Sequence, residues 1–281
     1  MINQLMKRVD NLPAFPATVV KVLELLSRDD YSMAEVAKVI SFDQSITVNI
    51  LKISNSAYFS FGRPIKTVRD ALAYLGKETL IRAVQTAGVS KFYKTSVKGY
   101  VASATDLWEH SVAVALMSQI LSKKIYGVEN SVLYTAALLH DVGKIIMGEY
   151  VHESIEKINL LVNLKHCSFL EAEEVVIGVN HAELGGKITR HWNLPPEICD
   201  AISFHHHPDL LEKNSVDMQW IVYLADQLCM MMGIGNGIDG LAYRGVSEVL
   251  KKFNLRDKDL EVNMMDLLTD LQSARSVLDI I

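Results

Sequence analysis

Apolar residues recur along most of the chain at the three- and four-residue spacing of amphipathic helices, and strand-like alternation is not sustained anywhere. Val19, Leu23 and Leu26 form one such apolar face, and Pro16 precedes it as expected near the start of a helix. The pattern therefore predicts an all-α fold, with bundle-like helix packing in both halves of the chain.

Several predicted helices begin with residues that can accept hydrogen bonds from the first free backbone N–H groups. Ser32 and Glu35 have the spacing of a capping box, and Asp43 precedes the next apolar helical segment. Thr67 is expected to cap a helix that stops at Gly76. Further helices are expected over residues 78–92, 104–125, 131–148, 153–163, 168–179, 181–192, 196–204, 217–232, 245–253 and 262–280.

Two breaks in the helical pattern suggest how the chain is divided. Residues 93–100 are largely polar and include Gly99, and residues 233–237 contain three glycines. We expect an N-terminal helical half over 1–98, a second helical half over 99–235, and C-terminal helices over 236–281 that pack on the core.

Composition and charge narrow the class of protein. A net charge of −5 and scattered basic residues argue against nucleic acid or an anionic membrane as a partner. The first ten residues lack the apolar core of a signal peptide, and no apolar run is long enough to span a bilayer. Cys167, Cys199 and Cys229 form no paired motif, so we expect reduced thiols in a cytoplasmic protein.

Histidine and aspartate residues recur at the ends of apolar helical segments. Carboxylates and imidazoles are rarely buried unless they are paired or bind metal, and both types bind divalent cations such as iron, manganese, nickel or magnesium. The sequence thus predicts a buried site for one or two divalent ions, with Lys144 placed to hold a phosphate oxygen or to neutralise a carboxylate. The series comprises Asp106, His110, His140, Asp141, His181, His205, His206 and Asp226.

Each member of this series also has an ordinary interpretation. A single histidine on a helix is more often a core or surface residue than a metal ligand, and we assign that role to His152, His166, His191 and His207. The series differs because its members all fall at the ends of apolar segments or within them, which favours metal binding for the group as a whole.

The string from Leu138 to Lys144, with its central His140-Asp141 pair, resembles the HD superfamily of metal-dependent phosphohydrolases. Over roughly residues 10 to 230 the chain is more similar to the HDOD family, a regulatory branch found in bacterial signalling proteins. The residues that carry this resemblance are Asp43, Leu51, Lys52, Asn55-Ser56-Ala57, Phe61, Ile65, Thr67, Ala71, Leu75-Gly76, His181 to Gly186, Trp192, Leu194-Pro195, Ile198, Ala201-Ile202, His205-His206 and Pro208.

The resemblance implies an all-α fold and a set of metal ligands. Seven residues match, one by one, the ligand positions of the related HD-GYP phosphodiesterases. Asp141 would bridge two metal ions and Asp106 would be an outer ligand. The other positions are His110, His140 and Asp226 for one ion, and His181, His205 and His206 for the other.

Two functions follow from this resemblance. The first is a signalling module that binds metal, and a nucleotide or phosphate, and changes its contacts with a partner protein. The alternative is an active phosphohydrolase or phosphodiesterase acting on a nucleotide or another phosphoester, with Asp141 and Lys144 as catalytic residues. The Gly-Tyr-Pro element that names the HD-GYP group is absent, because His205-His206 is followed by His207-Pro208-Asp209. We also expect neither a receiver domain nor any nucleic-acid partner.

Overall fold

The computed structural model describes residues 2–28, 30–55, 65–94, 99–100, 104–211, 217–234 and 246–278. All regular secondary structure in these ranges is helical, so the predicted all-α fold is confirmed. Within the same ranges, no helix is both long and apolar enough to cross a lipid bilayer.

The chain forms two compact units. The first comprises Met1–Pro13 and Phe92–Leu267, and the second Ala14–Lys91 and Leu268–Ile281. These units are defined by close packing of residues and do not test the predicted domain boundaries. The division into 1–98, 99–235 and 236–281 stays a prediction.

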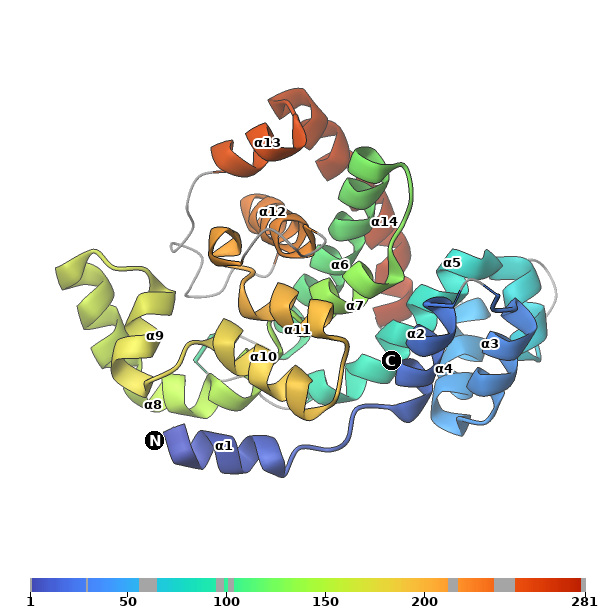
Figure 1. Ribbon diagram of the computed structural model, residues 1–281, viewed down its shortest axis with the longest axis horizontal. Helices are drawn as coiled ribbons and strands as arrows, with labels where there is room; N and C mark the ends of the chain where they lie inside the picture. Colours follow the sequence, from blue (N-terminus) through green and yellow to red (C-terminus); the bar gives the residue numbers. More distant parts are fainter. Residues whose placement is uncertain are drawn as a thin grey trace. The chain divides into compact units, whose positions relative to one another are not determined.

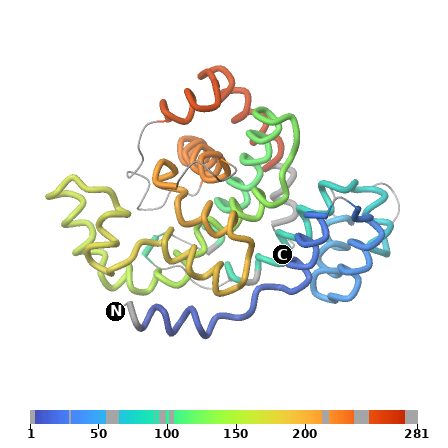
Figure 2. The backbone as a smooth tube through the Cα atoms, viewed as in Figure 1, coloured from blue at the N-terminus to red at the C-terminus, as the bar shows by residue number. Residues whose placement is uncertain are grey.

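The described part of the second unit includes helices α2 to α5, and the predicted caps of three of them are confirmed. Ser32 and Glu35 form the complete capping box, Asp43 accepts a hydrogen bond from the backbone of Ile46, and Thr67 accepts one from that of Asp70. Successive helices lie side by side in the backbone trace (Figure 2). The helices are α2 (Ala17–Leu26), α3 (Met33–Ser41), α4 (Gln44–Ser54) and α5 (Val68–Val89).

Two residues shape the end of α4 and the middle of α5. The Asn55 side chain donates to the carbonyl oxygen of Ile65 and accepts from its backbone N–H, both at 2.8 Å, so it ties the end of α4 to the start of the next described segment. Gly76 has φ of +77° and interrupts the helical geometry inside α5, at the position where a helix stop was predicted. Ser56 and Ala57 lie outside the described residues.

The first unit carries the predicted histidine and aspartate series. Figure 1 shows α6, α7, α11 and α12 next to one another, while α10 packs on α8 and α11 and α9 packs on α8. The elements of this unit are α1 (Ile2–Asp10), α6 (Ala104–Tyr126), α7 (Ser131–Leu139), α8 (Val142–Lys165), α9 (Phe169–Ile177), α10 (His181–His191), α11 (Pro196–Ser203), the short 3-10 helix η2 (Pro208–Leu210), α12 (Met218–Met231) and α13 (Ser247–Phe253). The 3-10 helix η1 (Ser90–Lys94) and α14 (Asp257–Leu278) each span the limit between the units.

Helix α1 was not predicted. Leu5 and Val9 are buried, and the helix packs on α8 and α10 of the first unit. The ion pair between Arg8 and Glu149, at 2.7 Å, also ties it to α8. Its helical face is short and its polar residues numerous, so the sequence pattern alone did not distinguish it from an irregular segment.

The predictions of one helix over residues 131–148 and of a separate helix over 153–163 are wrong. Helix α7 ends at Leu139, and α8 begins at Val142 and continues to Lys165. The turn between them contains His140 and Asp141, and the His140 ring bonds the carbonyl oxygen of Ala137 at 2.7 Å. This break separates the His-Asp pair from both helices, so that its side chains can face residues of α6, α10 and α12.

A close approach of α8 to α10 brings Asp141 near His181. A methyl group at Gly143 would overlap with the backbone carbonyl of His181, and it would also lie 3.0 Å from the backbone nitrogen of Gly185. Because backbone atoms cannot move aside independently, only glycine allows this separation of the two helices.

We therefore expect Gly143→Ala to lower the free energy of unfolding by about 3 kcal/mol, because the added methyl forces the helices apart. Gly186→Ala is the matched control, since its methyl meets side-chain atoms of Ser203 and Arg190 rather than backbone, and alanine favours the helix. It should cost about 1 kcal/mol or less. Urea unfolding followed by circular dichroism measures both, and equal losses would contradict this account of the helix contact.

Candidate metal centre

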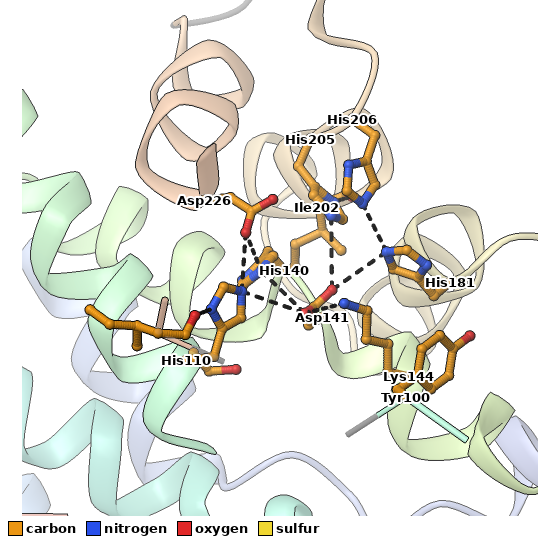
Figure 3. A network of polar contacts seen from close by, with 12 residues as sticks. Tyr100, His110, His140, Asp141, Lys144, His181, Ile202, His205, His206 and Asp226 are labelled. Atoms are coloured by element: carbon orange, nitrogen blue, oxygen red, sulfur yellow. Dashed lines mark hydrogen bonds and ion pairs between the residues drawn. The ribbon is translucent and has the colours of Figure 1, made fainter. Parts of the chain in front are cut away.

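Six segments of the first unit bring the predicted residues into one cluster (Figure 3). His110 lies on α6, His140 and Asp141 in the α7–α8 turn, His181 at the first position of α10, and Asp226 on α12. His205 and His206 directly follow α11, and Lys144 is in the first turn of α8. The predicted convergence of these side chains is thus observed.

The cluster is almost completely shielded from solvent. Six of its side chains belong to residues that are at most 2% exposed, a degree of burial that polar groups tolerate only with compensating interactions. His206 is half-buried. The six are His110, His140, Asp141, His181, His205 and Asp226.

The ligand atoms fall into two groups. Those of His110, His140 and Asp141 lie within 4.8 Å of one another, and so do those of His181, His205 and His206. Asp226 joins the first set, because its Oδ1 lies 3.0 Å from His110 Nε2 and 3.9 Å from His140 Nε2. We call His110, His140 and Asp226 the first donor group, and His181, His205 and His206 the second donor group.

The Asp141 carboxylate lies between the two donor groups. Its Oδ2 is 3.4 Å from His140 Nε2 and 3.9 Å from His110 Nε2. Its Oδ1 is 3.5 Å from His181 Nε2 and 4.0 Å from His205 Nε2. One carboxylate therefore presents a different oxygen atom to each group, which is the arrangement that a bridging ligand requires.

Backbone carbonyl groups orient three of the histidine rings. A carbonyl oxygen can only accept a hydrogen bond, so each Nδ1 carries a proton, and in the neutral ring each Nε2 keeps its lone pair. The three Nε2 atoms then face the interior of the cluster as potential ligands. The Nδ1 contacts are His110 to Ile234 at 3.0 Å, His140 to Ala137 at 2.7 Å, and His205 to Ile202 at 2.7 Å.

Among the described residues, the cluster contains buried polar atoms without a hydrogen-bond partner. They include His140 Nε2, His205 Nε2 and Asp141 Oδ1. Leaving such an atom unsatisfied costs about 1–3 kcal/mol, whereas a cation would satisfy several of them together. Imidazole nitrogen and carboxylate oxygen are also suitable donors for divalent first-row metals. The residues present therefore fit divalent metal binding.

Lys144 supplies a positive charge within this cluster. Its Nζ lies 2.7 Å from Asp141 Oδ2, and it is 4% exposed. Burial by itself would raise the pKa of Asp141, but the Lys144 ammonium and the His140 ring outweigh it and hold that pKa well below its usual range. Asp141 is therefore a carboxylate, the form that can bind a cation.

The histidines respond to burial in different ways. Burial lowers the pKa of His205 to about 3, with a further contribution from His140, and burial together with His205 lowers the pKa of His206. Burial also acts to lower the pKa of His140, but Asp141 and Asp226 outweigh it and raise that pKa. His205 and His206 are thus neutral near pH 7, as metal ligands must be.

Asp106 lies one turn before His110 on α6 and is half-buried. Its suggested role as an outer metal ligand stays a prediction.

Three residues that support the cluster were missed in the sequence. Glu173 is fully buried on α9 and accepts a hydrogen bond from Tyr100, while Tyr93 donates one to the carbonyl oxygen of Leu138, just before His140. Glu173 lies between Glu171 and Glu174 in the sequence. Only the helical spacing of buried positions could have shown that Glu173, and not its neighbours, is buried. The two tyrosines lie at the ends of residues 93–100, the predicted boundary segment.

The lowered pKa of His205 leads to a prediction for the metal-free protein. An unfolded histidine has a pKa of 6.5 and takes up a proton that folded His205 does not, so this residue reduces stability as the pH falls from about 6.5 towards 3. Lowering the pH from about 7.5 to about 5 should therefore reduce the free energy of unfolding by about 2 kcal/mol through His205 alone.

His205→Asn should remove this loss, as measured by urea unfolding at both pH values in the presence of a chelator. The change of the free energy of unfolding with pH is compared between the two proteins, because His140, with its raised pKa, increases stability as the pH falls over the same range. Asp141, with its lowered pKa, loses its contribution only below about pH 4. The same slope in both proteins would contradict a neutral, buried His205.

The fold is similar to that of solved bacterial proteins. An HDOD domain protein of unknown function from Geobacter sulfurreducens is 27% identical, with a TM-score of 0.76 and coverage of 99% of this chain and 95% of that one. A protein of Shewanella amazonensis SB2B, provisionally named a phosphohydrolase, has a TM-score of 0.71 at 21% identity, with coverage of 98% of this chain and 97% of that one. At that identity the second comparison shows a shared fold only.

Sequence comparison gives the family. An uncharacterized protein of Treponema pallidum (strain Nichols) is 23% identical over 207 residues, which cover 71% of this chain but 38% of that protein. This chain thus matches well under half the length of that curated relative. The model of the HDOD domain matches residues 12–208, which is more than half of the chain. The chain belongs to the HDOD domain family.

Proposed function

We propose that this chain is a regulatory protein of bacterial signalling whose HDOD domain binds two divalent metal ions. The observation that carries the proposal is the position of Asp141, which presents one oxygen atom to each donor group. The first donor group with Asp141 Oδ2 would hold one ion, and the second donor group with Asp141 Oδ1 would hold the other.

The environment of the cluster supports this proposal. The neutral ring of His205 and the ionised carboxylate of Asp141 need no change of protonation before a cation binds. The histidine rings are also held in place by their Nδ1 contacts, so little side-chain freedom would be lost on binding.

A nucleotide or phosphate is the ligand that this site would recognise. Bound divalent ions would act as Lewis acids towards phosphoryl oxygen atoms. Lys144 would contribute a buried ammonium group beside them, and its contact with Asp141 holds that charge within the cluster. Ligand binding would then be communicated to a partner protein. A reducing cytoplasm suits this role, since Cys167, Cys199 and Cys229 are free thiols.

We expect protein purified without a nickel column and loaded with Mn²⁺ to retain two ions per chain, as measured by mass spectrometry of the metal after gel filtration. Asp141→Ala should weaken binding at both positions, because it removes the shared ligand, and His181→Ala should affect the second donor group only. His191→Ala is the matched control, since His191 is exposed at the other end of α10 and should leave two ions bound. A native protein that binds no Mn²⁺ would refute the proposal.

Hydrolysis of a phosphoester is the second candidate function, and the contact between Lys144 and Asp141 favours it. In that function Lys144 would neutralise charge that develops on the phosphoryl oxygens. The lack of a Gly-Tyr-Pro element after His206 argues against cyclic dinucleotides as the substrate.

The two functions differ in their prediction for a generic phosphodiester, bis(p-nitrophenyl) phosphate. If the protein is purely regulatory, Mn²⁺-loaded protein should hydrolyse it no faster than Mn²⁺ in buffer. If it is a hydrolase, the rate should exceed that background by at least about tenfold, and Asp141→Ala should abolish it while His191→Ala retains it. Release of p-nitrophenol, followed by absorbance, measures the rate.

A further inference from the structure

His181 is held differently from the histidines that are oriented by backbone carbonyls. Its Nδ1 lies 2.9 Å and 3.1 Å from the two carboxylate oxygens of Glu173. The backbone N–H of His181 also donates to Glu173, at 2.9 Å. The same carboxylate therefore fixes both the ring and the main chain at the first residue of α10.

Glu173 is itself firmly held. It lies on α9 and is fully buried, and the Tyr100 hydroxyl donates a 2.6 Å hydrogen bond to its Oε1. Tyr100 is also fully buried, its ring packs edge-on against His181, and Lys144 Nζ lies 5.6 Å from the ring centroid. A buried carboxylate with three hydrogen-bond donors around it keeps its orientation, so the Nδ1 side of the His181 ring is fixed from outside the cluster. On its other side, Nε2 lies 2.9 Å from His206 Nε2 within the cluster.

We infer that Glu173 is the positioning residue of the second donor group. It holds His181 with the proton on Nδ1 and the lone pair on Nε2, and its negative charge makes the ring a better donor to a cation. The inference rests on the proposed binding of two metal ions and adds that the two positions depend on different supports.

The contacts of the first donor group indicate that Glu173 affects only the second donor group. His110 and His140 are oriented by the backbone carbonyls of Ile234 and Ala137, and Asp226 contacts His110 directly. Since none of these contacts involves Glu173, a change at Glu173 should leave the first position intact.

Titration calorimetry with Mn²⁺ on the full chain tests this selectivity. Glu173→Gln keeps the size of the side chain but removes its charge and one acceptor oxygen. We expect it to weaken one of the two binding events by about 10–100-fold and to leave the other within about threefold. Tyr100→Phe, which removes only the hydroxyl, should weaken the same event by a smaller factor and serves if Glu173→Gln does not fold.

Glu174→Gln is the matched control, because Glu174 is the next residue on α9, has the same charge, and is exposed. Its carboxylate accepts a hydrogen bond from the Asn180 side chain, and glutamine keeps an oxygen that can accept it. It should leave both binding events unchanged. If Glu173→Gln and Tyr100→Phe leave both events unchanged, or weaken both equally, the inference is wrong while metal binding itself stands. If the native protein shows neither binding event, the proposed function is refuted instead.

A second measurement does not depend on metal. In ¹⁵N-labelled, metal-free protein at about pH 8, the ring nitrogen shifts of His181 should show a protonated Nδ1 and an unprotonated Nε2. Glu173→Leu should shift the population towards the Nε2-protonated ring, since the acceptor at Nδ1 is lost, whereas Glu174→Gln should not. An Nε2-protonated His181 in the native protein would overturn the inference whatever the metal data show.

Discussion

The buried carboxylate of Asp141 is the constraint on which the rest of the first unit depends. It lies in the short turn between α7 and α8, pairs with Lys144, and faces histidines from α6, α10 and the end of α11. A charge that is 1% exposed must be compensated on every side. Lys144 and the surrounding histidines supply part of that compensation, while Asp141 Oδ1 has no hydrogen-bond partner within the described part of the chain. The geometry of this turn therefore determines which faces of those helices must point inward.

Close helix packing makes this arrangement possible. Gly143 lets the start of α8 approach the start of α10, which places Asp141 within 3.5 Å of His181. The backbone carbonyls of Ala137 and Ile202 then orient His140 and His205 from within the same turns that carry them. The site is therefore supported mainly by main-chain atoms, whose positions depend on helix geometry rather than on side-chain rotamers.

Glu173 and Tyr100 add a different kind of support, because they connect α9 to the cluster through side chains. The two donor groups consequently share Asp141 but differ in what holds them. In a regulatory protein such a difference would let one metal position respond to changes in α9 while the other stays occupied. The same architecture would also serve a phosphohydrolase, so turnover has to be decided by the chemistry of the loaded site.

The sequence by itself determined the all-α class, the capped starts of α3, α4 and α5, and the residues of the cluster, because these depend on local periodicity and on residue types that are rarely buried without a purpose. It did not determine α1, whose helical face is stabilised by packing on α8 and α10, or the break after α7 that a continuous apolar pattern concealed. Nor did it separate Glu173 from its neighbouring glutamates. Only the tertiary structure decided these features, because α1 and Glu173 are stabilised by contacts with other helices, and the break after α7 lies within an unbroken apolar pattern.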